Sequence, residues 1–290
     1  LWQESGQEVY SVPKGIHATL RPYQQKGFEW LCLLSEIEAG ACLADDMGLG
    51  KTLQTICFLV YQHSTRRVAP AGWSLILCPA SLMHNWRAEL EKFARGFGGY
   101  VYHNSTRSLE AFFASGARVL ITSYGTLRSD FNLLQPVNWE TIVLDESHTI
   151  KNPAAQITKA VYQLKSKARI ALSGTPVMNN TVDLYAQLHF LVPGLFGNQE
   201  FFRKEYAHPI DREHDPEKIR SLQKITAPFV LRRTKQQVAT DLPPKTESVI
   251  WCEMGQEQKA LYEETKEQIR DSLFLNIKSE GLNKSKDRKS

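Results

Sequence analysis

Short apolar runs alternate along most of the chain with longer stretches whose apolar residues recur every three or four positions. The run at residues 74–78 (SLILC) is typical of a strand buried on both faces of a sheet. Strands are expected at residues 41–44, 74–78, 100–102, 118–122, 141–144 and 169–172, and helices at residues 23–38, 51–62 and 82–93. This alternation predicts an α/β fold with a mainly parallel, doubly wound sheet and helices on both faces.

The pattern changes after Pro176. Residues 183–191, 200–206 and 216–225 are expected to be helical, with polar connectors and no convincing strand, which indicates a helical insertion. Strand-like alternation returns at residues 245–252. A long amphipathic helix is expected at residues 256–277, followed by a polar, basic tail.

Composition places few further limits on function. The 290 residues carry a net charge of +4, and 42% are hydrophobic, which excludes a disordered or low-complexity chain. The charge permits a nucleic-acid partner without arguing for one. No apolar run approaches the roughly 18 residues that a spanning helix needs, so no membrane partner is expected. The chain does not begin with Met, which indicates a piece of a longer protein.

Five cysteines, Cys32, Cys42, Cys57, Cys78 and Cys252, form no C-x-x-C pair and lie mostly in apolar runs. We interpret them as buried, reduced thiols rather than as disulfides or metal ligands. The expected location is therefore intracellular and reducing: the cytoplasm for a bacterial source, or the nucleus for a eukaryotic one.

A candidate phosphate-binding loop at residues 44–52 separates a predicted strand from a predicted helix. Its two glycines allow the backbone N–H groups to wrap a phosphate, Lys51 would reach the β- and γ-phosphates, and the Thr52 hydroxyl would bind Mg²⁺. The expected ATP-binding residues are Asp46, Met47, Gly48, Leu49, Gly50, Lys51 and Thr52. Asp45 replaces the first glycine of the usual pattern. A glycine turn preceding Lys-Thr by chance is the alternative, but the order of strand, loop and helix favours a phosphate site.

An acidic pair supplies the second half of a nucleotide site. Asp145 and Glu146 directly follow the predicted strand at residues 141–144. The aspartate would hold Mg²⁺, and the glutamate would orient or deprotonate the attacking water. Such a pair alone is often a solvated helix start, but together with the glycine loop it predicts a nucleoside triphosphatase.

With these two halves in place, the chain resembles the Swi/Snf-type ATPases, which are double-stranded-DNA translocases of helicase superfamily two. The resemblance rests on a series of motifs in order along the chain. They are residues 20–24 (LRPYQ, the Q motif), 44–52 (motif I, where Asp at the first glycine is usual), 79–82 with Asn85 and Trp86 (motif Ia), 122–125 (TSYG, motif Ib), 145–148 (DESH, motif II), 172–176 (LSGTP, motif III), 229–234 (FVLRRT) and 241–245 (DLPPK).

The resemblance implies a role for each matching residue. Gln24 would bond the adenine edge, Lys51, Asp145 and Glu146 would be catalytic, and Thr52 and Asp145 would hold Mg²⁺. Ser81, Thr122 and Tyr124 would contact the DNA backbone, and Ser173 and Thr175 would couple the nucleotide state to the DNA. His148 would be a further coupling residue or, alternatively, a polar helix-start residue.

The resemblance also implies a domain organisation. Residues 20–250 would form a RecA-like P-loop NTPase lobe, with a helical protrusion at about residues 182–232 inserted after motif III. Residues 1–19 would be an N-terminal extension, and residues 251–290 a long helix and basic tail leading toward a second lobe that this chain lacks. Because an arginine finger from a partner contributes on the order of 10³ to 10⁵ in rate, the isolated lobe is expected to be nearly inactive.

The function implied is ATP-driven translocation on double-stranded DNA, with ATP and Mg²⁺ as cofactors and remodelling of a DNA-bound protein. The partners would be duplex DNA and the second RecA-like lobe of the full-length chain. A non-catalytic nucleotide- and DNA-binding module, and an RNA helicase of the same superfamily, remain alternatives. Two local questions also stay open. Arg232 and Arg233 would grip a phosphate or the other lobe, or else be solvated or ion-paired, and Trp30 and Trp86 are core aromatics or base-stacking platforms.

Overall fold

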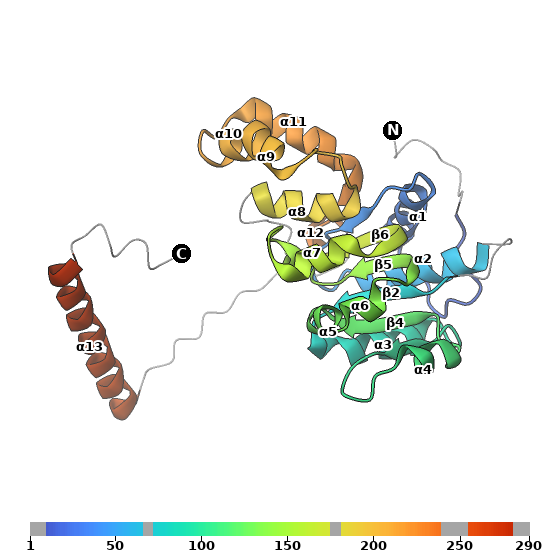
Figure 1. Cartoon of the computed structure of the whole chain (residues 1–290), viewed down its shortest axis with the longest axis horizontal. Coiled ribbons are helices and arrows are strands. Elements are labelled where there is room, and N and C mark those ends of the chain that lie inside the picture. Colours follow the sequence, from blue (N-terminus) through green and yellow to red (C-terminus); the bar gives the residue numbers. More distant parts are fainter. Residues whose placement is uncertain (1–9, 66–71, 175–180, 239–254, 281–290) are drawn as a thin grey trace. The chain divides into compact units, whose positions relative to one another are not determined.

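Seven parallel strands form one sheet at the centre of the first part of the chain (Figure 1). The computed structural model describes residues 10–65, 72–174, 181–238 and 255–280. The strands are β1 (Ala41–Leu43), β2 (Ser74–Cys78), β3 (Gly99–Val101), β4 (Val119–Ser123), β5 (Asn138–Leu144), β6 (Lys165–Leu172) and β7 (Val230–Leu231), in the spatial order β3-β4-β2-β5-β6-β1-β7. Every pairing is parallel, so the prediction of a parallel α/β fold is confirmed.

The inner strands bury side chains on both faces, because successive residues point to opposite sides of a sheet. In β2, Leu75 and Leu77 pack into one apolar cluster, whereas Ile76 and Cys78 pack into another. Helices α1 (Pro22–Glu36), α2 (Lys51–Thr65) and α3 (Met83–Phe93) cover the second of these faces. Helices α4 (Leu109–Ala114), α5 (Tyr124–Ser129), α6 (Phe131–Leu134), α7 (Gln156–Gln163) and α8 (Thr181–Leu191) contribute buried residues to the first.

The helices that follow β6 share their core with the sheet. Tyr185 and Phe190 of α8, Phe202 of α9 (Gln199–Phe202) and Leu222 of α11 (Pro216–Thr226) belong to the same apolar cluster as β2 and β5. Between α9 and α11 lie a π-helical turn (Arg203–Ala207) and α10 (His208–Asp211). The helical run therefore continues beyond the expected end at residue 206.

Strand β7 corrects the expectation that no strand follows Pro176 before residue 245. It has two residues, Val230 and Leu231, which pair with Cys42 and Leu43 of β1. A strand this short leaves no periodic pattern in the sequence, because its position depends on pairing with β1 and on packing of both its side chains against the apolar clusters. The expected strand at residues 245–252 and the basic tail at residues 281–290 lie outside the described residues.

The chain divides into two compact units, residues 1–240 and 241–290. Of the second unit the structure describes α13 (Gln256–Glu280), three residues longer than the helix expected to end at residue 277. No helix among the described residues is long and apolar enough to cross a membrane.

The described cysteines Cys32, Cys42, Cys57 and Cys78 are buried free thiols, as predicted, and Cys252 lies outside the described residues. Burial raises the pKa of Cys42 and Cys57 to about 12. These thiols therefore stay protonated and unreactive at neutral pH.

Candidate nucleotide site

Motifs I, Ia, Ib, II and III gather at one edge of the sheet, because each lies at the carboxyl end of a parallel strand. The first residue after β5 and the first residue after β6 stay hydrogen-bonded to a neighbouring strand. Asp145 N donates to Leu77 O of β2 at 2.8 Å, and Ser173 N donates to Leu43 O of β1 at 3.2 Å. Strand β6 alone separates β1, which leads into the phosphate loop, from β5, which leads into Asp145. Sites far apart in the sequence are thereby brought to one surface. Thr175 lies outside the described residues.

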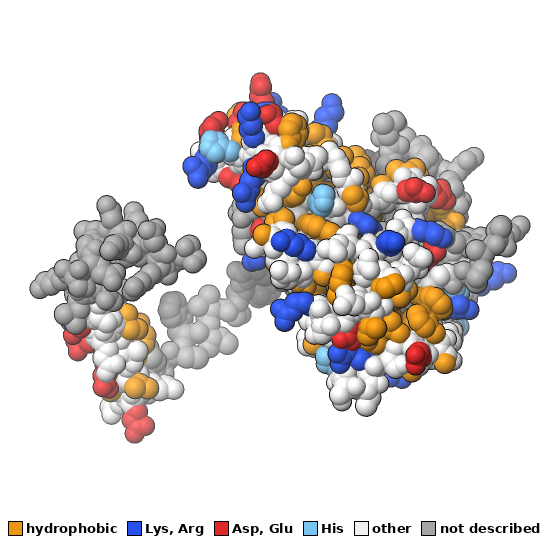
Figure 2. Space-filling model, viewed as in Figure 1, with side chains coloured by type: hydrophobic (Ala, Val, Ile, Leu, Met, Phe, Trp, Pro, Cys, Tyr) orange, Lys and Arg blue, Asp and Glu red, His pale blue; other side chains and the backbone are white. Residues whose placement is uncertain are grey.

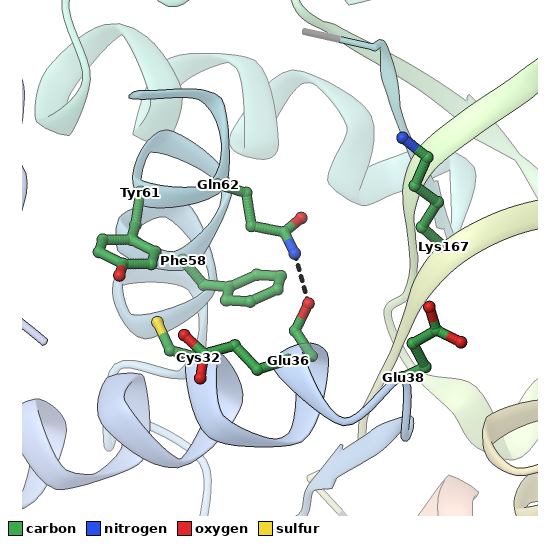
Figure 3. A pocket seen from close by; sticks show the side chains of 8 residues that line it. Cys32, Glu36, Glu38, Phe58, Tyr61, Gln62 and Lys167 are labelled. Carbon is green, nitrogen blue, oxygen red and sulfur yellow. Dashed lines mark hydrogen bonds between the residues drawn. The ribbon is translucent and has the colours of Figure 1, made fainter. Parts of the chain in front are cut away.

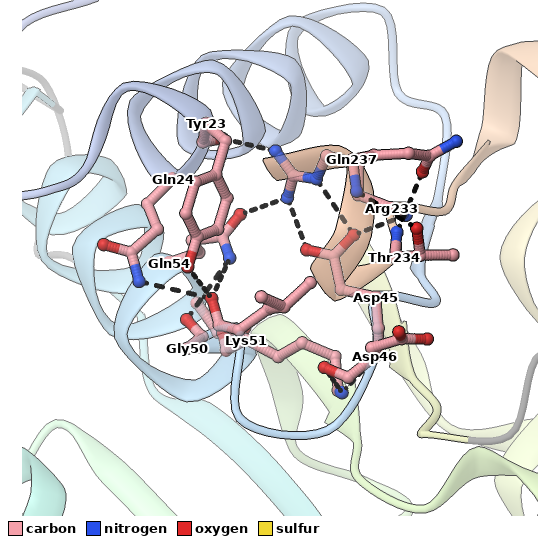
Figure 4. A network of polar contacts seen from close by, with 12 residues as sticks. Tyr23, Gln24, Asp45, Asp46, Gly50, Lys51, Gln54, Arg233, Thr234 and Gln237 are labelled. Atoms are coloured by element: carbon pink, nitrogen blue, oxygen red, sulfur yellow. Dashed lines mark hydrogen bonds and ion pairs between the residues drawn. The ribbon is translucent and has the colours of Figure 1, made fainter. Parts of the chain in front are cut away.

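The loop after β1 has the backbone conformation that its glycines permit. Gly48 and Gly50 have φ angles of 85° and 75°, in the left-handed region where a Cβ is unfavourable. Lys51 opens α2, and its Nζ donates to the carbonyl oxygens of Asp45 at 2.6 Å and Asp46 at 3.3 Å (Figure 4). The Lys51 ammonium thus bonds to carbonyl oxygens of the loop, and an oxygen of a bound phosphate would take their place.

The pKa of Lys51 is shifted in opposite directions by burial and by four acidic neighbours. Burial lowers the pKa of Lys51, and Asp45, Glu146, Asp145 and Asp46 oppose that shift. The lysine therefore lies within electrostatic reach of both halves of the predicted site.

Two hydrogen bonds fix the carboxylate of Asp145. Its Oδ1 accepts from the backbone N of Glu146 at 2.9 Å, and its Oδ2 accepts from Nε1 of Trp86 at 2.8 Å. Trp86 is 1% exposed, which confirms that it is a core aromatic, but its bond to Asp145 was not foreseen. Trp30 is also buried and donates to the Pro228 carbonyl. Neither ring offers a face to a base.

Glu146 has a left-handed backbone, with φ of 48°, which is uncommon for a residue other than glycine. Its Oε2 lies 3.3 Å from Nδ1 of His148, whose side chain is exposed. Glu146 therefore has an imidazole partner within contact distance, and its side chain is partly open to solvent.

The available ligands fit Mg²⁺. The Thr52 hydroxyl and the Asp145 carboxylate are oxygen donors, and Mg²⁺ prefers oxygen and is often held by one or two carboxylates plus substrate phosphates. Within the described ranges no three His, Cys, Asp or Glu side chains cluster as metal ligands. The remaining ligands would thus come from nucleotide phosphates and water.

Gln24 and Tyr23 lie against the phosphate loop. Gln24 is buried, its Nε2 donates to Leu49 O at 3.2 Å, and its Oε1 accepts from Arg21 N at 2.9 Å. The Tyr23 hydroxyl donates to the same Leu49 carbonyl at 3.1 Å. The Q-motif glutamine therefore supports the loop directly, and its contact with adenine stays a prediction.

The residues expected to contact DNA divide by exposure. Ser81 is exposed. Thr122 is fully buried, with its hydroxyl donating to Tyr102 O at 2.8 Å, and Tyr124 is 5% exposed, with its hydroxyl donating to Asp145 O at 2.8 Å. Burial also raises the pKa of Tyr124 well above its ordinary value. A direct DNA contact through the Thr122 or Tyr124 side chain therefore disagrees with the inward direction of both hydroxyls, and Tyr124 instead links motif Ib to motif II.

Motif III lies against the phosphate loop through Gly174. A Cβ placed there would lie 3.0 Å from Cγ of Met47, so this close approach favours glycine. Ser173, the preceding residue, is 3% exposed. The loop that would sense phosphate and the segment expected to couple it to DNA are thus in contact.

Arg233 is ion-paired with Asp45, as in the second of the interpretations left open for this arginine (Figure 4). The pair joins positions 188 apart in the chain. The signal for this ion pair in the sequence is Asp45 itself, which stands where the usual phosphate loop has glycine.

A cavity of about 330 Å³ lies elsewhere in the first unit (Figure 3). It is lined by Cys32, Ser35, Glu36, Glu38, Phe58, Tyr61, Gln62 and Lys167. Along α1, Glu36 is roughly 18 Å from Gln24 at about 1.5 Å per residue. The cavity is therefore separate from the phosphate loop.

The fold and the site define a RecA-like phosphate-loop lobe. The SNF2-related domain matches residues 23–289, so the chain belongs to that family. It is 39% identical to the TATA-binding protein-associated factor mot1 of Aspergillus fumigatus over 279 residues, covering 89% of this chain and 15% of that protein. It is 34% identical to the chromatin-remodeling ATPase INO80 of Drosophila melanogaster, covering 92% of this chain and 17% of that protein.

Solved structures agree with the fold. The Sulfolobus solfataricus SWI2/SNF2 ATPase core in complex with dsDNA is 40% identical with a TM-score of 0.73, covering 93% of this chain and 56% of that one. The core domain from the same organism, described without DNA, is 42% identical with a TM-score of 0.70, covering 92% and 54%. The chain thus spans about half of the solved cores and a small part of the curated relatives.

Proposed function

We propose that this chain is the ATP-binding lobe of a DNA-dependent ATPase that translocates on double-stranded DNA and remodels DNA-bound proteins. The observation that carries the proposal is that Lys51, which follows β1, and the pair Asp145 and Glu146, which follow β5, lie beyond the carboxyl ends of strands in one parallel sheet. This is the arrangement that phosphoryl transfer to water requires. Membership of the SNF2 family supports the choice of DNA over RNA.

In this proposal the loop backbone and Lys51 bind the phosphates of ATP, and Gln24 contacts the adenine edge. Thr52 and Asp145 hold Mg²⁺, which when bound neutralises charge that develops on the phosphates. Trp86 keeps the Asp145 carboxylate in one orientation. Glu146 takes a proton from the attacking water. His148, at 3.3 Å from Glu146, orients that carboxylate and couples it to the exposed surface.

DNA contact is proposed at the exposed ends of the same motifs. Ser81 lies in a 3₁₀ turn (Ala80–Leu82) that leads into α3, so its hydroxyl and the first amides of the helix are suited to a backbone phosphate. Such contacts position DNA without reading its sequence. On the face of the first unit in Figure 2, basic side chains are interspersed with acidic and apolar ones and form no broad basic patch.

Nucleotide-state coupling is proposed to pass through Tyr124, Ser173 and Thr175. The second RecA-like lobe would follow this chain in the full-length protein and supply the arginine finger. We therefore expect residues 20–250 to be the first lobe, with the helices after β6 as its protrusion, and the isolated lobe to be nearly inactive. An intracellular protein acting on DNA in the bacterial cytoplasm or the eukaryotic nucleus would fit this role.

The test is ATP turnover by the full-length protein with no nucleic acid, with duplex DNA and with duplex RNA. We expect stimulation by duplex DNA and its loss in Lys51→Ala and Glu146→Gln. ATP binding without turnover in the full-length protein would favour the non-catalytic module. Stimulation by RNA alone would favour an RNA helicase.

A further inference from the structure

The chain leaving the protrusion runs beside the phosphate loop. After β7 pairs with β1, Ala44 N donates to Leu231 O at 2.8 Å and Asp46 N donates to Arg233 O at 3.0 Å. Lys235 N donates to the Asp46 carboxylate at 3.0 Å. The start of the loop is therefore held on one side by residues almost two hundred positions later.

Arg233 also neutralises a carboxylate inside the protein. Asp45 is fully buried, and its Oδ1 accepts from the backbone N of Arg233 at 3.0 Å and from its Nε at 2.9 Å. A further guanidinium nitrogen, Nη2, donates to Oδ2 of Asp45. This forked geometry is one that arginine makes and lysine does not.

The guanidinium reaches two helices as well. Its Nη2 donates to Oε1 of Gln54 on α2 at 2.8 Å, and its Nη1 donates to the Tyr23 carbonyl on α1. Its carbon lies 5.3 Å from the centre of the Tyr23 ring. Tyr23 and Gln54 each donate in turn to the Leu49 carbonyl of the loop, at 3.1 and 3.4 Å (Figure 4). Arg233 thus contacts Asp45 at the start of the loop and two of the side chains that hold the Leu49 carbonyl.

We propose that Arg233 is a positioning residue for ATP: through Asp45, Tyr23 and Gln54 it holds the phosphate loop in its nucleotide-binding form. The inference deepens the proposed function and rests on it. Arg233 touches no reacting atom, so it acts through the loop.

The first test compares the full-length protein with Arg233→Lys, which keeps the charge but loses the fork. Loop positioning affects ground and transition states alike, so we expect KM and the Kd for ATP to rise about tenfold while kcat changes less than about threefold. Affinity for duplex DNA without nucleotide should stay unchanged. Arg220→Lys, on the exposed side of α11, is the matched control and should leave all these values as in the wild type.

A merely structural role would lower the unfolding temperature of Arg233→Lys and leave the ATP Kd within about twofold of the wild type, and this result would overturn the proposal. If that variant does not fold, Asp45→Gly with Arg233→Met removes both charges and so leaves no unpaired buried ion. This pair of changes should restore folding but keep a raised ATP Kd. A wild-type Kd in the double variant would also overturn the inference.

The two proposals fail separately. Turnover of the wild type with duplex DNA tests the proposed function, whereas the ratio of ATP Kd values between variants needs no turnover at all. If duplex DNA does not stimulate turnover by the wild type but Arg233→Lys binds ATP about tenfold more weakly, the positioning role alone is retained. If DNA stimulates the wild type but Arg233→Lys has the wild-type Kd for ATP, only the proposed ATPase function is retained.

Discussion

The indole nitrogen of Trp86 lies 2.8 Å from Oδ2 of Asp145, so a core side chain on α3 fixes the orientation of the acidic residue that follows β5. The relationship ties a packing residue to the predicted Mg²⁺ ligand. It also explains how a partly exposed carboxylate is kept in one position at the sheet edge.

Trp86→Phe keeps most of the packing and removes the N–H donor. We expect the Mg²⁺ concentration for half-maximal ATPase activity to rise several-fold, because the Asp145 carboxylate loses one of its two hydrogen bonds. The free energy of unfolding should fall by about 1.5–3 kcal/mol, the range for a hydrogen bond to a charged group. Titration of activity against Mg²⁺ and urea unfolding measure the two effects.

Trp139→Phe is the control, since that ring is equally buried and donates to the Leu134 carbonyl. It should lose stability without changing the Mg²⁺ requirement. Equal Mg²⁺ curves for Trp86→Phe and Trp139→Phe would mean that Trp86 does not position Asp145.

Tyr124→Phe removes the hydrogen bond between motif Ib and the backbone of Asp145. We expect basal ATP turnover by the full-length protein to stay within about twofold and stimulation by duplex DNA to fall about tenfold, since the link carries about one neutral hydrogen bond. The measurement is the ratio of turnover with and without DNA. An unchanged ratio would exclude Tyr124 from coupling.

Gly27→Ala tests the crowding around Arg233. A Cβ at this position would lie 1.9 Å from Oε1 of Gln54 and 2.9 Å from Nη2 of Arg233, so both side chains must move. We expect a loss of about 1–3 kcal/mol in stability, as for overpacked sites, together with weaker ATP binding. Gly15→Ala, whose Cβ would meet Val60 at an ordinary 3.6 Å, is the control. Wild-type stability in Gly27→Ala would contradict the packing described.

Asp130 gives the lobe an acid-sensitive contact. Hydrogen bonds from Arg107, followed by one from Tyr102, lower the pKa of Asp130 below its ordinary 3.8. A lowered carboxyl pKa stabilises the folded state above the unfolded pKa, and this stabilisation is lost as the pH falls through the folded value. The difference in unfolding free energy between the wild type and Asp130→Asn should therefore be largest near pH 7 and shrink below about pH 4. A difference that is constant from pH 7 to pH 3 would contradict the assignment.

Continuous apolar runs and motif spacing carry most of what the sequence predicts. The run at residues 74–78 and the glycine loop before Lys51 are local features, and β2, β1 and α2 lie where these features place them. The pairs Trp86–Asp145 and Arg233–Asp45 join positions 59 and 188 apart, and only the folded sheet brings them together. The inward direction of the Thr122 and Tyr124 hydroxyls likewise depends on the carbonyls of Tyr102, after β3, and Asp145, after β5, which no local pattern encodes.

The most direct test of the central claim is movement along DNA. Full-length wild-type protein and Glu146→Gln would be added to a duplex carrying a third, triplex-forming strand, with ATP and Mg²⁺, and release of that strand would be followed over time. The account predicts ATP-dependent release on duplexes of unrelated sequence by the wild type and none by Glu146→Gln. ATP turnover that ignores DNA, with no strand released, would contradict it.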